Sequence, residues 1–248
     1  MQNRGHLIMD LLTDDSFFNG KISIRQNKLG YRFSVDSVLL ASYVKSAAGD
    51  KVLDIGTGCG IISLILAYRN PGIEIYGIEV QKSLADLAAL NVKNNCMEEQ
   101  IKIVYTDVKN LKKSMLSGSP DIIVCNPPYR KANSGRVNPD NQRALARHEI
   151  MISLPEIFES ASRLMDISSK FIMIYPSERI ADIIAYMRLS GIEPKCFKFI
   201  YSKNNSESKL VIAEGVKGGR AGAKVTAPLV IYKDDGSYTD EVKNMFIP

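Results

Sequence analysis

The chain has 248 residues, of which 45% are hydrophobic and 24% charged, a balance that excludes disordered and fibrous proteins. Its net charge of +5 is compatible with a polyanionic partner without requiring one. The four cysteines show no Cys-x-x-Cys spacing and there are only two histidines, so we expect free thiols and no metal site. No apolar run approaches the ~18 residues of a membrane span, and the first residues do not form a secretory signal, so we expect a cytoplasmic protein.

Residues 1–48 are predicted to form an N-terminal extension, made of a hairpin and a helix, that packs on the core. Two short runs of alternating polarity, Ile22–Gln26 and Tyr31–Val35, flank a turn that ends in Gly30, and this pattern predicts a hairpin. The helical spacing of apolar residues then predicts a helix that begins at Asp36.

We expect residues 49–248 to form a single α/β domain. This domain begins with a strand that ends in a glycine-rich turn. In this turn Asp54, Gly56, Gly58 and Gly60 alternate with other residues, and a helical run follows. The glycines permit positive φ and let a ligand lie against the backbone at the carboxyl end of the strand. Asp54 would repel a phosphate, but it could hold the turn or, through water, a cationic amino-acid group. A strand-to-helix turn without a ligand is the alternative.

Two further acids follow the next two strands. Glu79 lies at the end of the strand Glu74–Val80, where it could accept hydrogen bonds from ribose hydroxyls, although an acid there also suits the start of the next helix. Asp107 follows the strand Ile101–Tyr105 and could accept a hydrogen bond from an adenine amino group. We expect both acids to share one crevice with Asp54 at the rim of the sheet.

The next strand, Asp121–Cys125, leads into Asn126, Pro127, Pro128 and Tyr129. The prolines lack N–H donors, so the neighbouring carbonyls stay free to accept hydrogen bonds. The Asn126 side-chain oxygen and the Pro127 carbonyl could accept both hydrogens of an exocyclic amino group, while Tyr129 offers a face on which a planar substrate stacks. The alternative is a tight turn that Asn126 caps and whose Tyr129 covers the core.

Two basic stretches follow. Residues 130–147 carry four arginines, Arg130 and Arg136 among them, and one lysine against a single acid. This composition predicts contacts with phosphates, and a solvated surface loop is the alternative. Residues 217–224, which end in Lys224, form a second basic stretch that we expect to be flexible.

The remaining pattern predicts a helix over Leu154–Leu164, a strand over Lys170–Tyr175 and a helix over Arg179–Leu189. Residues 195–201 and 209–216 then read as two strands joined by a short polar loop. Because so short a loop leaves no room for a crossover helix, one of these strands must be antiparallel to its neighbours.

The glycine turn, Glu79, Asp107 and the Asn-Pro-Pro-Tyr stretch together resemble class I S-adenosylmethionine-dependent methyltransferases that act on amino groups. Two flanking blocks, Tyr31–Ala41 and Ala146–Glu149, resemble the tRNA1(Val) adenine-N6 methyltransferase family. The resemblance runs from about Phe17 to the C-terminus. It implies an α/β, Rossmann-like fold with helices on both faces of a seven-stranded, mostly parallel sheet that has one antiparallel strand.

The same resemblance implies S-adenosyl-L-methionine as cofactor and an RNA substrate, expected to be tRNA methylated at the adenine 3′ to the anticodon. The expected site residues are Asn126, Pro127 and Tyr129 for catalysis; Asp54, Gly56, Gly58, Gly60, Glu79, Asp107 and Asn126 for the cofactor; and Phe33, Asp36, Arg130, Arg136 and Lys224 for the substrate.

Two other functions stay open. A protein-glutamine N5-methyltransferase shares the Asn-Pro-Pro-Tyr motif because a side-chain amide also offers two donors, but that family carries a larger N-terminal helical domain, and only about 50 residues precede the glycine turn here. A non-catalytic cofactor-binding partner subunit is the other, and the presence of both Asn126 and Tyr129 argues against it. The sequence leaves open which RNA is modified and the oligomeric state.

Overall fold

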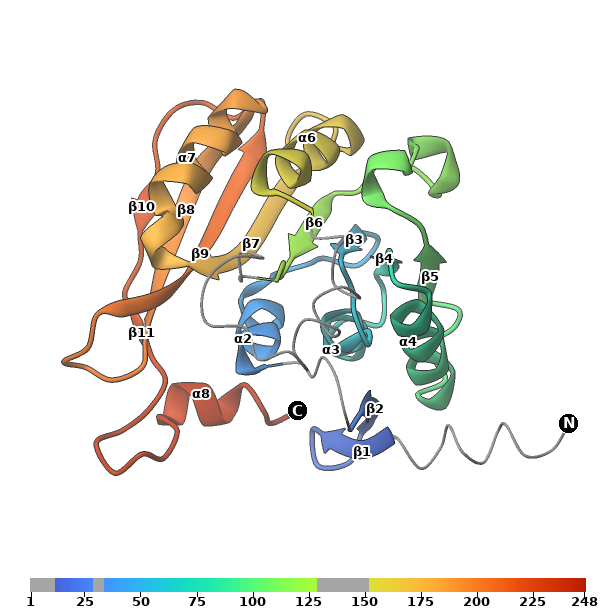
Figure 1. Ribbon diagram of the computed structural model, residues 1–248, viewed down its shortest axis with the longest axis horizontal. Helices are drawn as coiled ribbons and strands as arrows, with labels where there is room; N and C mark the ends of the chain where they lie inside the picture. The colour runs from blue at the N-terminus through green and yellow to red at the C-terminus, as the bar shows by residue number, and fades with distance from the viewer. Residues whose placement is uncertain (1–11, 29–33, 129–151) are drawn as a thin grey trace, which may run out of the picture.

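A mixed sheet organises the computed structural model, which describes residues 12–28, 34–128 and 152–248 (Figure 1). Its strands are β3 (Lys51–Ile55), β4 (Glu74–Glu79), β5 (Ile101–Tyr105), β6 (Ile122–Cys125), β7 (Lys170–Pro176), β8 (Ile192–Tyr201), β9 (Ser208–Lys217), β10 (Lys224–Val225) and β11 (Leu229–Val230). They lie in the order β5-β4-β3-β6-β7-β9-β8-β10, with β11 also paired to β8. Only β9 runs antiparallel to its neighbours within this sheet.

The predicted α/β fold with one antiparallel strand is therefore confirmed. The seven expected strands correspond to β3 through β9 in chain order. The two-residue strands β10 and β11 were not predicted, and both add to the outer edge of β8. Two residues are too few to show a period, so sequence patterning could not reveal them.

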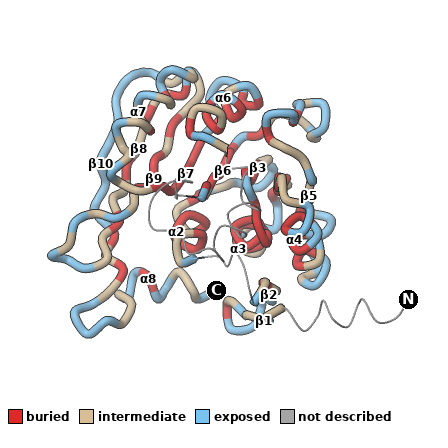
Figure 2. The backbone as a smooth tube through the Cα atoms, in the orientation of Figure 1, coloured by how far each residue is buried: buried red, intermediate tan, exposed pale blue. Residues whose placement is uncertain are grey.

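Helices cover both faces of the sheet (Figure 1). These helices are α2 (Val35–Tyr43), α3 (Ile61–Arg69) and α4 (Lys82–Asn94) on one face, and α6 (Leu154–Leu164) and α7 (Ile180–Leu189) on the other. Successive residues of β6 alternate between the two cores: Ile122 and Val124 pack with α2 and α3, while Ile123 and Cys125 pack with α6 and α7. Burial on both faces explains why the central strands are continuous apolar runs (Figure 2).

The N-terminal hairpin differs from the predicted one. Its strands are β1 (Leu12–Phe17) and β2 (Ile22–Asn27), so the strand at Ile22 was predicted correctly but its partner was wrong. Val35, expected in a strand, begins α2 instead. The true turn contains Asn19 and Gly20, both at positive φ, and Asn-Gly is the residue pair that favours a tight hairpin turn.

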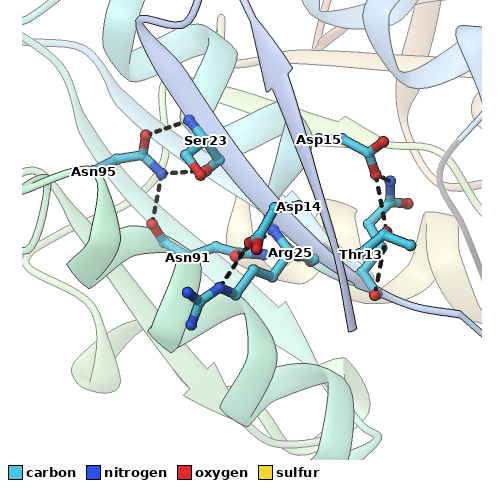
Figure 3. Close-up of polar contacts among 8 residues, drawn as sticks. Thr13, Asp14, Asp15, Ser23, Arg25, Asn91 and Asn95 are labelled. Carbon is cyan, nitrogen blue, oxygen red and sulfur yellow. Dashed lines mark hydrogen bonds and ion pairs between the residues drawn. The ribbon is translucent and has the colours of Figure 1, made fainter. Parts of the chain in front are cut away.

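Asn91 of α4 and Asn95, which caps the C-terminal end of that helix, hold the hairpin against the core (Figure 3). Asn95 accepts a hydrogen bond from the Ser23 N–H at 2.9 Å and donates to the Ser23 carbonyl at 2.7 Å. Asn91 forms the same pair of bonds with Arg25, at 2.8 and 3.0 Å, and also donates to the carbonyl of Cys59 at 2.9 Å. The side-chain amides thus occupy the edge of β2 as a neighbouring strand would, and they satisfy its peptide groups.

A column of aromatic rings joins this hairpin to the C-terminal segment. Phe17 stacks on Phe246 with ring centroids 5.9 Å apart, Phe246 on Tyr238 at 5.7 Å, and Tyr238 on Tyr232 at 5.3 Å. Phe246 follows the short helix α8 (Asp240–Asn244). The two ends of the described chain therefore pack directly against each other.

Several other elements bear on the predictions. The helix Leu154–Leu164 has the predicted bounds. The sequence of residues 111–116 also suggests one short helix, and the structure does not have it. That region holds two 3-10 turns, η1 (Val108–Asn110) and η2 (Lys113–Met115), and a third, η3 (Ser177–Arg179), precedes α7. In the part of the chain that is described, no helix is long and apolar enough to cross a membrane.

Candidate active site

A cavity of about 250 Å³ opens where β3, β4, β5 and β6 end. It brings together the predicted residues Gly56, Gly58, Glu79, Asp107, Asn126 and Pro127. Its other lining residues are Ile55, Ile78, Val80, Gln81, Leu84, Thr106, Val108, Lys109, Cys125, Pro128, Ile152 and Glu156. Because these four strands are parallel neighbours, the residues that follow them meet at one edge of the sheet, which is where ligands bind in open α/β folds.

Glu79 fixes the glycine turn from the end of the adjacent strand. Its Oε2 accepts a hydrogen bond from the Gly58 N–H at 3.0 Å, and its Oε1 accepts one from the Gln81 N–H at 2.8 Å. Burial raises the pKa of Glu79, while these N–H donors act in the opposite direction. A carboxylate has about four lone-pair sites, so Glu79 can hold the turn and still accept from two hydroxyls of a ligand in the cavity.

The glycines of the turn divide into two groups. Gly56 and Gly58, at φ 72° and 60°, line the cavity. Gly60, at φ 87°, caps α3 and is outside the lining; a Cβ there would lie 3.5 Å from the Cβ of Ala88. Gly60 was predicted to bind the cofactor, and the structure places it at the contact between α3 and α4.

Asp54 lies behind the turn and is fully buried. Its Oδ2 accepts hydrogen bonds from Thr57 Oγ1 at 2.7 Å and Ser63 Oγ at 2.8 Å. Its Oδ1 is buried without a hydrogen-bond partner among the described residues. Burial, reinforced by the charge of Glu79, raises the pKa of Asp54 to about 6, although the two hydroxyl donors lower it. Asp54 is absent from the cavity lining, so it does not share the crevice with Glu79 and Asp107 as predicted; it holds the glycine turn from behind, through Thr57 and Ser63.

Asp107 also lines the cavity and caps the 3-10 turn η1. Its Oδ1 accepts a hydrogen bond from the Lys109 N–H at 2.9 Å. The Lys109 ammonium lies 3.6 Å from Asp107 Oδ2 and 3.1 Å from Glu156 Oε1. The neighbouring oxygen of Glu156 accepts hydrogen bonds from the N–H and hydroxyl of Ser153, and these donors, with Lys109, lower the pKa of Glu156 to about 2.

Lys109 and Glu156 line the cavity but were not predicted as site residues. The available signal was Ser153-x-x-Glu156, a helix-capping pattern that predicts where α6 begins. It gives no indication that Glu156 reaches a lysine on the other side of the cavity.

Asn126 follows β6 directly, and its side-chain amide is held by the N-terminal extension. Its Nδ2 donates a hydrogen bond to Ser37 Oγ at 2.9 Å. Ser37 lies in the first turn of α2 and is 2% exposed. The sequence predicted the neighbouring Asp36, rather than Ser37, as a site residue. Asp36 is half-buried and lies outside the cavity lining.

The remaining predicted site residues fall elsewhere. Phe33, Tyr129, Arg130 and Arg136 lie outside the described residues. Lys224 is exposed on β10, four strands away from β6. At the usual strand spacing this places Lys224 roughly 19 Å from Asn126 across the sheet, so the two are not parts of one cavity.

Solved structures share this fold. A predicted O-methyltransferase from Agrobacterium tumefaciens aligns with a TM-score of 0.68 and 20% identity, covering 85% of this chain and 94% of that one. Pyrococcus horikoshii TYW2, solved in complex with MeSAdo, aligns with a TM-score of 0.57 and 16% identity, covering 85% and 73%. The chain therefore has the fold of class I methyltransferases.

Comparison with other sequences gives the family. Residues 32–146 match the family model described as Methyltransferase small domain. The tRNA1(Val) (adenine(37)-N6)-methyltransferase of Porphyromonas gingivalis W83 is 28% identical over 242 residues, 94% of each chain. The Vibrio cholerae protein of the same name, from strain M66-2, is 30% identical over 181 residues, 73% of each chain. The chain belongs to the tRNA1(Val) (adenine(37)-N6)-methyltransferase family.

Proposed function

We propose that this protein transfers the methyl group of S-adenosylmethionine to N6 of an adenine in tRNA, at the nucleotide 3′ to the anticodon. The observation that carries the proposal is the placement of Asn126 and Pro127 on the wall of a cavity that also holds the glycine turn, Glu79 and Asp107. The names of the curated relatives support the choice of tRNA and of adenine N6.

In this proposal, different residues would bind different parts of the cofactor. S-adenosylmethionine, when bound, supplies an electrophilic methyl group. Glu79 would accept hydrogen bonds from the ribose hydroxyls and Asp107 from the adenine amino group of the cofactor. Asp54, which lies behind the cavity lining, would hold the glycine turn in shape through Thr57 and Ser63. The glycine turn lets the cofactor lie against the backbone.

The target adenine is held on the other side of the cavity. The Asn126 side-chain oxygen and the Pro127 carbonyl accept the two hydrogens of its amino group, which aims the nitrogen lone pair at the methyl group. As the nitrogen becomes more positive in the transition state, these two fixed dipoles stabilise it. Tyr129 stacks on the base after it leaves the anticodon loop. The reaction is a direct displacement, and the chain contributes alignment and a polar cradle.

The RNA contacts come from both ends of the chain in this proposal. Residues 1–48 act as an extension that carries Phe33 and Asp36 to the substrate, while residues 49–248 form the methyltransferase domain. Arg130 and Arg136 contact phosphates near the target, and Lys224 contacts the tRNA farther away. The protein acts in the cytoplasm, where its substrate is made. Among the described residues, no His, Cys, Asp and Glu cluster could hold a metal ion.

Mass spectrometry of nucleosides and peptides tests the proposal. The protein is incubated with S-adenosylmethionine and, separately, with unmodified tRNA, rRNA and a protein pool, with Asn126→Ala as control. N6-methyladenosine in tRNA at the predicted nucleotide is the expected product. N5-methylglutamine in the protein pool would replace the proposal by a protein-glutamine methyltransferase, and no methyl transfer to any pool would leave a cofactor-binding subunit.

A further inference from the structure

We infer that Ser37 is a positioning residue that orients the Asn126 amide for methyl transfer, an inference that rests on the proposed function. Ser37 comes from the N-terminal extension, outside the strands and turns that form the cavity. Its Oγ accepts the hydrogen bond from Asn126 Nδ2 at 2.9 Å. The extension therefore has a part in the chemistry besides any contact with RNA.

The position of Ser37 is fixed before substrate arrives. Its side chain is 2% exposed, and the next residues of α2, Val38, Leu39 and Leu40, are buried in the core shared with α3. Its N–H donates to the Ser34 carbonyl at 3.2 Å in the first turn of the helix. A hydroxyl held in this way gives the Asn126 amide a hydrogen-bond partner at a fixed place.

The orientation of an asparagine amide decides whether it can bind an amino group. One end of the amide is a carbonyl that accepts hydrogen bonds, and the other is an NH2 that donates them. The target amino group presents two donors, so productive binding needs the oxygen of Asn126 toward the substrate and the nitrogen away from it. Ser37 supplies the partner that the nitrogen needs in this orientation. Without the Ser37 hydroxyl, the amide would lose a hydrogen bond that holds it in place.

The structure provides a matched control on the same helix. Ser42 of α2 also accepts a side-chain hydrogen bond, from Arg69 Nη1 at 3.0 Å, and like Ser37 it lies outside the cavity lining. Ser37→Ala and Ser42→Ala each remove one hydroxyl from α2. Only Ser37→Ala changes the surroundings of Asn126.

The test measures single-turnover methylation of tRNA together with cofactor affinity. Ser37→Ala should slow the single-turnover step about 3- to 10-fold, the value of one hydrogen bond, with cofactor affinity unchanged. Ser42→Ala should leave the rate unchanged, and Ser37→Thr, which keeps the hydroxyl, should restore most of it. In an Asn126→Ala background Ser37→Ala should have no further effect, since the two residues act as a unit. Additive losses in this double variant would overturn the inference.

A spectroscopic measurement separates this inference from the proposed function. With 15N-labelled asparagine, the NH2 signals of Asn126 are identified by their absence from the spectrum of the Asn126→Ala protein. Ser37→Ala should shift these signals and Ser42→Ala should not, whether or not the wild-type protein methylates tRNA. Unmoved signals in Ser37→Ala would overturn the inference. Wild-type protein with the expected shift but no methyl transfer would overturn the proposed function alone. If Ser37→Ala fails to fold, Ser37→Cys keeps the test decisive, because a thiol is of similar size and a much weaker hydrogen-bond acceptor.

Discussion

Asn91 of α4 pairs with the peptide group of Arg25 in β2, accepting from its N–H at 2.8 Å and donating to its carbonyl at 3.0 Å. The same buried amide donates to the carbonyl of Cys59, which precedes Gly60, the last glycine of the glycine turn. One side chain therefore connects the N-terminal hairpin to the glycine turn. Arg25 and Cys59 are 34 residues apart in sequence (59 − 25), and the strands of the hairpin do not pair with those of the larger sheet.

Replacing Asn91 should destabilise the fold more than replacing its neighbour on the hairpin edge. Asn91→Ala leaves the Arg25 peptide and the Cys59 carbonyl without this partner, at a cost of about 2–4 kcal/mol in the free energy of unfolding. Asn95→Ala is the control, because Asn95 is only half-buried and its partners can turn to water, so about 1 kcal/mol is expected. Urea denaturation of both variants measures the difference. Equal losses would show that the link to the glycine turn contributes nothing.

Glu79→Ala should weaken cofactor binding by ~1.5–3 kcal/mol, because it removes a charged acceptor from the ribose and frees the Gly58 N–H that it holds in place. Glu74→Ala is the matched control. Glu74 begins the same strand at its other end, where it pairs with Lys102 away from the cavity. Titration calorimetry with S-adenosylmethionine measures both. The assignment of Glu79 fails if the two variants bind as tightly as wild type.

Asp54 predicts a pH dependence of stability. Its pKa in the folded protein is about 6, above the ordinary value of 3.8. The folded protein therefore holds this proton more tightly than the unfolded chain, so the associated stability is fully present below pH 4 and is lost as the pH rises through 6. About 1.4 kcal/mol per pH unit gives a total of about 3 kcal/mol.

The Asp54→Asn protein has no such titration. Relative to wild type, its free energy of unfolding should rise by about 3 kcal/mol between pH 4 and pH 7.5. Urea denaturation without cofactor across this range checks the difference between the two proteins, which cancels the contributions of other carboxyl groups. Parallel curves for the two proteins would show that Asp54 titrates normally in the folded state.

Asn126→Ala should reduce turnover by 10²–10³ while cofactor affinity stays nearly unchanged, because the lost contact is made to the target nitrogen in the transition state. Single-turnover assays and calorimetry on the same preparation separate the two effects. A large loss of cofactor affinity would place Asn126 on the cofactor rather than on the substrate.

The salt dependence of tRNA binding tests the proposed basic contacts. Each lost phosphate contact should reduce the slope of log affinity against log salt by about one unit or slightly less. Arg130→Ala with Arg136→Ala should therefore lower it by nearly two. Lys224→Ala lowers it further only if the tRNA extends to the far edge of the sheet. Lys102→Ala is the control, since this lysine is already paired with Glu74. An intact slope in the arginine variant would place the RNA path elsewhere.

The elements with strong periodicity could be predicted from sequence because local pattern and burial agree there. The strands that end at Ile55 and Cys125 are buried on both faces, and α6 begins at a capping box. The first strand of the hairpin could not, because Asp14 and Asp15 make it polar. Its acids are matched by Arg25 and Gln26 of the partner strand.

The site also contains residues that could be predicted from the sequence and residues that could not. Glu79 and Asp107 line the same cavity as the glycine turn, because Glu79 ends β4 and Asp107 comes shortly after β5, at the same edge of the sheet. Ser37 was missed because its partner Asn126 lies 89 positions later in the sequence. No local pattern predicts that pair. It exists only once α2 has packed beside β6.

The aromatic column has a consequence for how the protein is made. Phe17 leaves the ribosome long before Phe246, so a nascent chain cannot complete the stack that joins its ends. The hairpin can pair its own strands and dock on α4 early, but the face that carries Phe17 stays exposed to water until the last segment emerges. Final packing of the hairpin is therefore a late event of biosynthesis, and chains arrested before Phe246 retain an apolar surface that chaperones can recognise.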